Sequence, residues 1–182
     1  TEAGKDPLEF RKQYLRESRY QDLVKTLEEK SGWKSRKKND GWGVAITEYF
    51  NSIVGEVVKV SKNTSSGIKI DKVTAVMDCG WYVNPDIIRA QVEGSVIMAL
   101  GAATKHAIHF KEGQAVEKNF DAYKMPRISE IPEIEVHIMD NDEKAGGVGE
   151  PGLPPFTPAL CNAIFDLTGK RIRKLPFDLN EV

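Results

Sequence analysis

The sequence predicts an α+β fold in which a mixed or antiparallel sheet packs against helices. Three runs rich in β-branched and aromatic residues follow one another at residues 42–50, 53–61 and 68–77, which favours a meander of antiparallel strands. Segments with a helical spacing of apolar residues lie before and after these runs. The chain has 182 residues, 40% hydrophobic and 29% charged, which suffices for one domain with a core. We therefore expect residues 1–182 to form a single domain.

The charges of the chain are nearly balanced, with 26 Lys and Arg against 27 Asp and Glu. No global field attracts nucleic acid, so we expect no nucleic-acid partner. No apolar run approaches the roughly 18 residues that span a bilayer, so no transmembrane segment is predicted. The first residues, Thr-Glu-Ala-Gly-Lys-Asp, show neither a signal-peptide pattern nor an initiator Met. They suggest a processed protein or an excised fragment, and the compartment, cytoplasmic or periplasmic, stays open.

Cysteines and histidines give no sign of a metal site. Cys79 and Cys161 lie far apart and form no C-x-x-C motif, so two thiols are expected, with one disulfide as the alternative. His106, His109 and His137 lack metal-ligand spacing and are interpreted as structural or surface residues. No residue is therefore predicted as a metal ligand. No Ser-His-Asp or Cys-His arrangement can be assembled from the spacing, so hydrolase chemistry has no support.

The N-terminal part predicts one long helix. Asp6 is a suitable N-cap before Pro7, and the helix should run to about Lys30 and stop at Gly32. Its apolar residues fit a single stripe only loosely. The basic segment 35–41 favours a solvated loop, with phosphate binding as the alternative. The connection Asn-Thr-Ser-Ser-Gly, which follows the second β-rich run, favours a hairpin.

The second half predicts two further helices and a strand. Asn84-Pro85-Asp86 should open a central, buried helix through Ala103, whose small residues, Gly94 among them, let another backbone approach closely. Residues 131–139 alternate between apolar and polar, which is typical of a strand with one solvated face. Thr157-Pro158 should open the last helix, which ends at Gly169.

A glycine-rich segment at residues 147–152, Gly-Val-Gly-Glu-Pro-Gly, matches the dinucleotide-binding pattern G-x-G-x-x-G. Its context argues against that function, because a polar turn separates it from the preceding strand, Pro151 lies inside it, and Arg171 stands where an acid is expected. What remains is the carboxylate of Glu150 in a loop where glycines allow close approach of a bulky group. By its chemistry alone, such a residue could equally be an ordinary exposed Glu.

A series of short motifs runs in order along almost the whole chain. The C-terminal ones are residues 147–152, Pro158-Ala159, Asn162-Ala163-Ile164 and residues 168–176. The upstream ones are Asp78-Cys79-Gly80, Val83-Asn84-Pro85, Gln91-Val92-Glu93-Gly94, Leu100-Gly101, Asn119-Phe120-Asp121-Ala122-Tyr123 and Ile131-Pro132. Together they resemble the C-terminal portion of the molybdenum-binding large subunit of the xanthine dehydrogenase/aldehyde oxidase family. Phe10-Arg11 and Gly32-Trp33 are similar to its isoquinoline 1-oxidoreductase beta-subunit branch.

The resemblance implies three site residues. The Glu of the Gly-Glu-Pro motif is the active-site base beside molybdenum in this family, which implies that role for Glu150. The Gln of the Gln-Val-Glu-Gly motif lies against the pterin, so Gln91 is the candidate cofactor contact. Gly149, which has no side chain, would leave room at the metal. Asp78 and Asn84 belong to the motifs as well, but they could equally be a strand-end residue and a helix cap.

The resemblance also implies a fold, a reaction and a cofactor. The fold would resemble the molybdenum cofactor-binding domain of xanthine dehydrogenase-type enzymes. The reaction would be hydroxylation of an electron-poor carbon in an N-heterocycle or aldehyde, with oxygen from water. The cofactor would be molybdopterin cytosine dinucleotide with molybdenum, and electrons would leave through iron–sulfur clusters on a small partner subunit.

The family's large subunit is several times longer than this chain. We therefore expect either a fragment of a longer large subunit or a split subunit that completes a site in trans, and we expect the isolated chain to be metal-free and inactive. The alternative is a non-catalytic interaction module that retains the family fold. The intact Gly-Glu-Pro sequence favours retained chemistry. A fragment should also expose a large apolar patch where its missing part packs.

Overall fold

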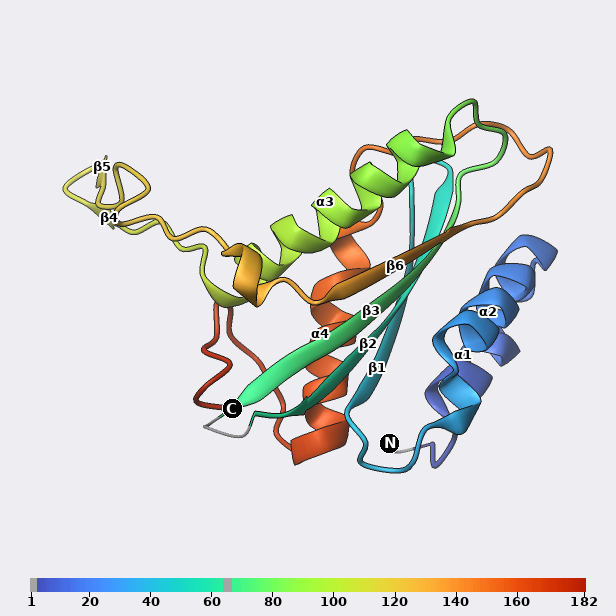
Figure 1. The fold of residues 1–182 in the computed structure, drawn as a ribbon, viewed down its shortest axis with the longest axis horizontal. Coiled ribbons are helices and arrows are strands. Elements are labelled where there is room, and N and C mark those ends of the chain that lie inside the picture. Colours follow the sequence, from blue (N-terminus) through green and yellow to red (C-terminus); the bar gives the residue numbers. More distant parts are fainter. Residues whose placement is uncertain (1–2, 64–66) are drawn as a thin grey trace.

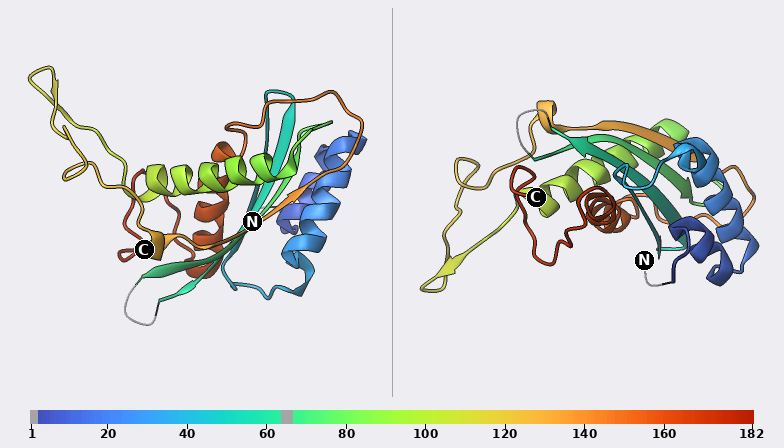
Figure 2. Two further views of the ribbon diagram at one scale, coloured as in Figure 1. Left: turned by 45° about the horizontal axis from the view of Figure 1, so that its top comes forward. Right: turned by 90° about the horizontal axis from the view of Figure 1, so that it is seen from below.

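The computed structural model describes residues 3–63 and 67–182, and it has three layers (Figures 1 and 2). A sheet of four strands forms the middle layer. Helices α1 (Pro7–Tyr14) and α2 (Ser18–Ser31) cover one face, and α3 (Pro85–Thr104) and α4 (Leu153–Thr168) cover the other. The α+β prediction with packed helices is confirmed. Among the described residues, no helix has the length and apolar character needed to cross a membrane.

The sheet is mixed. Strands β1 (Trp42–Tyr49), β2 (Ser52–Lys62) and β3 (Ile68–Asp78) form the predicted antiparallel meander. Strand β6 (Glu133–Ile138) pairs in parallel with β3, so the order is β1-β2-β3-β6. The predicted hairpin connection between β2 and β3 falls mostly on residues 64–66, which lie outside the described part of the chain.

The N-terminal segment forms two helices rather than the single helix predicted to about Lys30. Asp6 caps α1 as expected and accepts from the amides of Leu8 (2.8 Å) and Glu9 (3.1 Å). The chain then breaks, and the Gln21 side chain donates to main-chain carbonyl oxygens exposed at the end of α1. The break lets both helices turn an apolar side toward the sheet, which one straight helix with a loose stripe could not do.

Helix α3 begins and ends close to the predicted residues, but it is only half buried. Asn84 caps it by accepting from the amides of Asp86 (2.9 Å) and Ile87 (3.3 Å), so its interpretation as a helix cap is confirmed. One face packs on the sheet, while the side chain of Ile87 is 59% exposed. A Cβ at Gly94 would meet nothing within 4 Å, so the expected close approach of a backbone there is wrong.

Residues 106–127 form an arm that leaves the end of α3 and returns before β6 (Figures 1 and 2). It carries the short strands β4 (Phe110–Lys111) and β5 (Gln114–Ala115). At its base the ring of His106 stacks on Tyr123, with centroids 4.8 Å apart. The arm projects from the body of the domain (Figure 1), and most of its side chains are exposed.

Helix α4 starts four residues before the predicted Thr157-Pro158. Its first turn holds Pro154 and Pro155, which are tolerated because the first amides of a helix need no intrahelical acceptor. Pro158 therefore lies inside the helix rather than at its start. The end is as predicted, because Gly169 adopts a left-handed conformation with φ of 74° and terminates the last turn.

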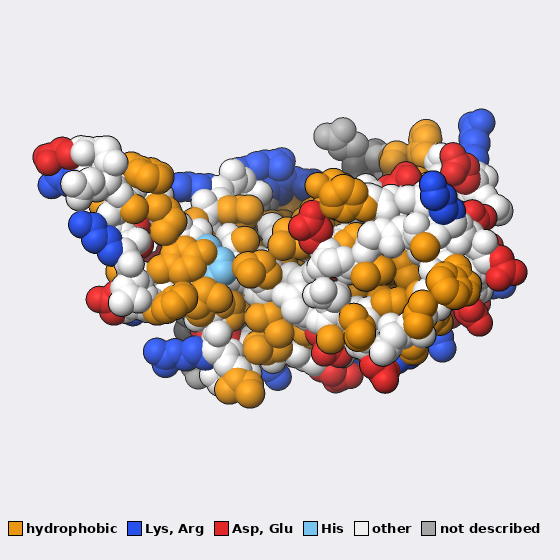
Figure 3. Space-filling model, turned by 90° about the horizontal axis from the view of Figure 1, so that it is seen from above, with side chains coloured by type: hydrophobic (Ala, Val, Ile, Leu, Met, Phe, Trp, Pro, Cys, Tyr) orange, Lys and Arg blue, Asp and Glu red, His pale blue; other side chains and the backbone are white. Residues whose placement is uncertain are grey.

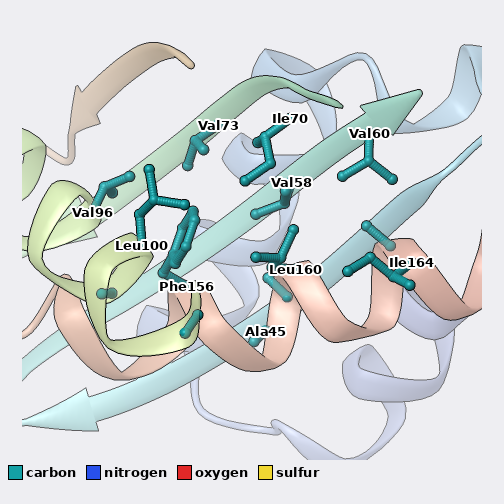
Figure 4. Close-up of a cluster of buried hydrophobic side chains, with 14 of the residues drawn as sticks. Ala45, Val58, Val60, Ile70, Val73, Val96, Leu100, Phe156, Leu160 and Ile164 are labelled. Carbon is teal, nitrogen blue, oxygen red and sulfur yellow. The ribbon is translucent and has the colours of Figure 1, made fainter. Parts of the chain in front are cut away.

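Apolar cores lie on both faces of the sheet. The core beneath α3 and α4 joins sheet residues such as Val58 and Val73 to Leu100, Phe156 and Leu160 (Figure 4). The core beneath α1 and α2 is built around Leu23, Leu27, Trp33, Val57 and Val76. Both cysteines are free thiols, Cys79 buried and Cys161 partly buried, as expected.

A carboxylic acid lies inside the face of the sheet that α3 and α4 cover. Glu56 is fully buried between Val54 and Val58 on β2 and is flanked across the strands by Ala45 and Ala75. Neither of its carboxyl oxygens has a hydrogen-bond partner in the described part of the chain. Burial raises the pKa of this carboxyl well above its ordinary value, because an apolar environment disfavours the charged form.

Candidate functional site

The glycine-rich loop between β6 and α4 is fastened to the sheet at two places. The Gly146 amide donates to the carbonyl of Cys79 (2.8 Å), just after β3. The Gly147 amide donates to the carbonyl of Phe50 (2.8 Å), and the Gly147 carbonyl accepts from the hydroxyl of Ser52 (2.6 Å). A Cβ at Gly146 would overlap the Ser52 hydroxyl oxygen, so only glycine fits this approach. The loop therefore has a defined position above the β1–β2 turn.

Asp78, at the end of β3, ties this region to α2. Its buried carboxylate accepts from Arg19 Nε (2.7 Å) and Arg19 Nη2 (2.9 Å), the Gly80 amide (3.0 Å) and Asn141 Nδ2 (3.2 Å). Burial alone would raise the pKa of Asp78, but these hydrogen bonds and the charge of Arg19 together lower it. The contacts all run to protein groups that hold elements together, which supports the structural interpretation of Asp78.

The loop also leans on the first half of α3. Val148 packs into the cluster that contains Val92, and a Cβ at Gly152 would lie 3.2 Å from Ser95 Cβ. Gln91 is four residues before Ser95, so the two are neighbours on the helix surface. The Gln91 side chain is exposed at the border of this contact. The fold thus brings Gln91 to the loop that carries Glu150, although 58 residues separate them.

Gly149 and Glu150 form the exposed crest of the loop. A Cβ at Gly149 would meet nothing within 4 Å, so the space beside it is open. The Glu150 carbonyl accepts from the Leu153 amide (3.0 Å) and starts α4. Within residues 3–63 and 67–182 the Glu150 carboxylate makes no hydrogen bond or ion pair, and the amides of Val148, Gly149 and Glu150 donate to no protein acceptor. Donors and one acceptor are therefore available to a bound group.

The loop that carries Gly149 and Glu150 passes the beginning of α3, the helix that contains Gln91 (Figure 1). The site is open: Gln91, Gly149 and Glu150 are all exposed. The described part of the chain therefore leaves the Glu150 carboxylate in contact with solvent. The described residues also contain no group of three or more His, Cys, Asp or Glu side chains arranged to hold a metal ion.

Sequence reasoning missed the residues that position the loop. Arg19 lies 59 residues from Asp78, and Ser52 lies 95 residues from Gly147. An acid at the end of a buried strand signals that some donor must satisfy it. The sequence could not tell which of 26 basic residues does so, because the partner is set by the packing of α2 on the sheet.

Comparisons with known proteins agree on one family. The model of the molybdopterin cofactor-binding domain matches residues 2–132. The chain is 36% identical over 94% of its length to isoquinoline 1-oxidoreductase subunit beta of Brevundimonas diminuta, covering 23% of that protein. It is 32% identical over 78% of its length to the molybdenum-binding subunit of an aldehyde oxidoreductase of Escherichia coli K12, covering 21% of it. The chain thus spans about a quarter of the length of these relatives.

Solved structures show the same fold. CO dehydrogenase from Oligotropha carboxidovorans matches with a TM-score of 0.60 and 25% identity, over 70% of this chain and 17% of that one. Aldehyde oxidoreductase from Desulfovibrio gigas matches with a TM-score of 0.58 and 25% identity, over 69% of this chain and 14% of that one. By the match of the domain model to most of its length and by these relatives, the chain belongs to the family of molybdopterin cofactor-binding domains.

Proposed function

We propose that this chain is the part of a molybdenum hydroxylase that supplies the general base, Glu150, and a cofactor contact, Gln91. The observation that carries the proposal is the Glu150 carboxylate, which is exposed and unpartnered on a loop fastened to the sheet and to α3. A surface Glu with no function would not need such an anchored loop. The family membership supplies the group that this loop would face.

The residues present fit a bulky, polar cofactor. Open space beside Gly149 leaves room for it, and the amides of Val148, Gly149 and Glu150 can donate to anionic or carbonyl oxygens. The Gln91 amide offers both a donor and an acceptor for the edge of a pterin. We infer that these groups would hold molybdopterin, in its cytosine dinucleotide form, against the first half of α3.

In the proposed reaction the substrate carbon loses two electrons and gains a hydroxyl oxygen from water, so the overall change is R–H plus water to R–OH plus two electrons and two protons. The cofactor, when bound, supplies the two-electron oxidation. Glu150 accepts a proton on a carboxylate oxygen as the water-derived oxygen bonds to carbon. The anchored loop holds that carboxylate in place, which is what a general base requires beyond its pKa.

The remaining parts of the reaction belong to protein that this chain does not contain. A longer large subunit, or a separate chain that completes it, would cover Glu150 and exclude water from it. Iron–sulfur clusters on a small subunit would take the electrons. An N-heterocycle or an aldehyde is the proposed substrate, because relatives named for isoquinoline, nicotinate and aldehyde oxidation match this chain. The isolated chain would hold no molybdenum and have no activity.

The test compares Glu150→Gln with wild type in the longest native protein, purified with its partner. Molybdenum is counted by elemental mass spectrometry, and the rate is followed as substrate-dependent dye reduction with isoquinoline, nicotinate and benzaldehyde. We expect Glu150→Gln to keep its molybdenum and to lose at least about 100-fold in rate, because a positioned base contributes about 10²–10⁴-fold.

Glu143→Gln is the matched control, since Glu143 is an exposed acid on the same loop. It should keep both metal and rate. A Glu150→Gln enzyme with the wild-type rate would exclude the general-base role. A native complex without molybdenum would instead exclude the enzyme assignment and leave a non-catalytic interaction module.

A further inference from the structure

A cavity of about 730 Å³ lies at the exposed edge of β1, between α1 and the second half of α4. Such a volume is in the range of small-molecule sites, about 300–1,000 Å³. Phe10 from α1, Trp42 from β1 and Phe165 from α4 supply its apolar walls. The cavity lies at the start of β1, whereas the glycine-rich loop is fastened beyond its end, about 20 Å away at about 3.3 Å per residue. It is therefore separate from the candidate catalytic site.

Cationic side chains dominate the cavity lining. The lining contains one acid, Asp166, and four cations, Lys5, Arg11, Arg36 and Arg171. The Arg171 guanidinium is engaged within the protein, because it lies over the Phe165 ring at 3.8 Å from its centroid. The Asp166 carboxylate is engaged by the main chain, because it accepts from the amides of Gly41 (3.0 Å) and Trp42 (3.1 Å). Arg36 pairs with Asp6, outside the lining. The cavity as a whole thus carries excess positive charge in a chain whose net charge is −1.

Arg11 is the centre of this positive charge. Its guanidinium donates to the carbonyls of Pro7 (2.9 Å) and Val44 (3.2 Å), and no carboxylate in the described residues forms an ion pair with it. Burial lowers the pKa of Arg11, and the charge of Asp6 offsets this only in part. A partly buried cation with no carboxylate in direct contact is costly, and three of its five N–H groups remain for a ligand.

One structural role of Arg11 is already visible. With Asn162, which donates to the same Val44 carbonyl (3.2 Å), it covers the free edge of β1. That role uses a single N–H group of Arg11. It explains neither the cavity nor the other cations in the cavity lining. A neutral amide such as Asn162 covers the edge without the cost of a desolvated charge.

We propose that this cavity binds a small anion with an apolar body, whose carboxylate or phosphate lies on Arg11 and whose apolar part lies against Phe10, Trp42 and Phe165. A planar guanidinium suits either oxyanion because both accept two parallel N–H bonds. Lys5 is exposed, and its amine donates to Gln13 Oε1 (2.7 Å), so it adds charge to the cavity without a fixed geometry toward a ligand. The inference does not depend on the proposed hydroxylase function.

Isothermal titration calorimetry on the purified protein tests the site with three probes: benzoate, adenosine 5′-monophosphate and inorganic phosphate. We expect benzoate or the nucleotide to bind at least tenfold more tightly than inorganic phosphate, because only they contact the apolar walls. Arg11→Met keeps the apolar stem and should weaken that binding at least tenfold. Arg16→Met, at an exposed arginine outside the cavity, should leave it unchanged.

Lys5→Met is the second variant, chosen because its side chain is exposed and its loss should not disturb folding. It should weaken binding about two- to fivefold, and added salt should reduce the difference. The proposal is overturned if no probe binds wild type at millimolar concentration, or if inorganic phosphate binds as tightly as the larger anions. It is also overturned if folded Arg11→Met, or Lys5→Met should Arg11→Met not fold, binds like wild type.

Discussion

Glu56 makes the stability of this domain depend on pH. Burial raises the pKa of the Glu56 carboxyl in the folded state. The folded protein therefore keeps a proton that the unfolded chain releases above about pH 4.3. The unfolded state is then favoured as the pH rises, by about 1.4 kcal/mol per pH unit up to the folded pKa. This contribution to stability is present at low pH and lost toward neutral pH.

We therefore expect Glu56→Gln to be more stable than wild type at pH 8 and close to it at pH 4.5. Urea unfolding at the two values measures the difference, with the exposed Glu29→Gln as the control that should track wild type. A difference that is the same at both pH values would mean that Glu56 is ionised or paired in the folded protein.

The pair formed by Arg19 and Asp78 should act in the opposite sense. Removal of the guanidinium in Arg19→Met leaves a buried carboxylate with fewer donors, which should cost about 3 kcal/mol at pH 7. Because the folded pKa of Asp78 is lowered, the stabilisation is present above the unfolded pKa of about 3.9 and is lost as the pH falls through the folded value. Chemical denaturation between pH 3 and 7 measures the free energy of unfolding of Arg19→Met, with the exposed Arg16→Met as the control. An equal loss of stability in the two variants would contradict the role of the Arg19–Asp78 pair.

At the level of single residues, the sequence predicted helix caps better than it predicted ion-pair partners between distant elements. Asp6, Asn84 and Gly169 were identifiable because caps depend on neighbours a few residues away. Glu150 and Gln91 came from a resemblance, and the structure places them near one loop. The Arg19–Asp78 pair and the buried Glu56 were not predictable, because both depend on packing between distant elements.

The glycine-rich loop supplies a prediction at the scale of an element. Gly146→Ala places a methyl group on the Ser52 hydroxyl and should cost about 1–3 kcal/mol, whereas Gly149→Ala enters open space and should change stability by less than about 0.5 kcal/mol. If Gly149 leaves room for the cofactor, its variant should instead lower molybdenum content in the longer native protein. Thermal unfolding and elemental analysis of both variants separate the effects; equal destabilisation would contradict the anchoring of the loop.

The strands of the meander were predictable and the N-terminal helix was not, for related reasons. Five of the nine residues in 53–61 are Val or Ile, so β2 follows from local preference. Nothing in Leu15-Arg16-Glu17 stops a helix locally, and the break between α1 and α2 arises from packing on the sheet. The parallel pairing of β6 with β3 likewise depends on the path of α3 and the arm, which no local pattern encodes.

On the scale of the whole molecule, the arm, α3 and the residues next to them expose apolar side chains (Figure 3). Its large members are Val83, Ile87, Met98, Ile108, Phe110, Val116, Phe120, Met125 and Ile128. Exposed apolar side chains gathered in this way are typical of a surface that contacts another protein segment. That this chain is part of a longer subunit stays a prediction, which the following experiment tests.

We predict that the isolated chain binds the dye 8-anilinonaphthalene-1-sulfonate and self-associates. A triple variant with Phe110→Ser, Phe120→Ser and Ile128→Ser should reduce both dye binding and self-association. It should not lower the melting temperature, because these side chains are 75%, 72% and 90% exposed. Dye fluorescence and sedimentation velocity measure the change. A monomeric wild-type chain with no dye binding would argue for a self-sufficient module.

The hydrogen bond that fastens the loop joins Ser52 to Gly147, 95 residues later in the chain, and this separation has a kinetic consequence. A contact between such distant parts of a chain is expected to form late, because closing the long segment between them costs entropy until the strands have paired. Its loss should then speed unfolding while leaving the folding rate almost unchanged. The edge that carries Glu150 would then assemble after the antiparallel meander of β1 to β3, which would leave an interval in which a bulky group could enter before the edge is complete.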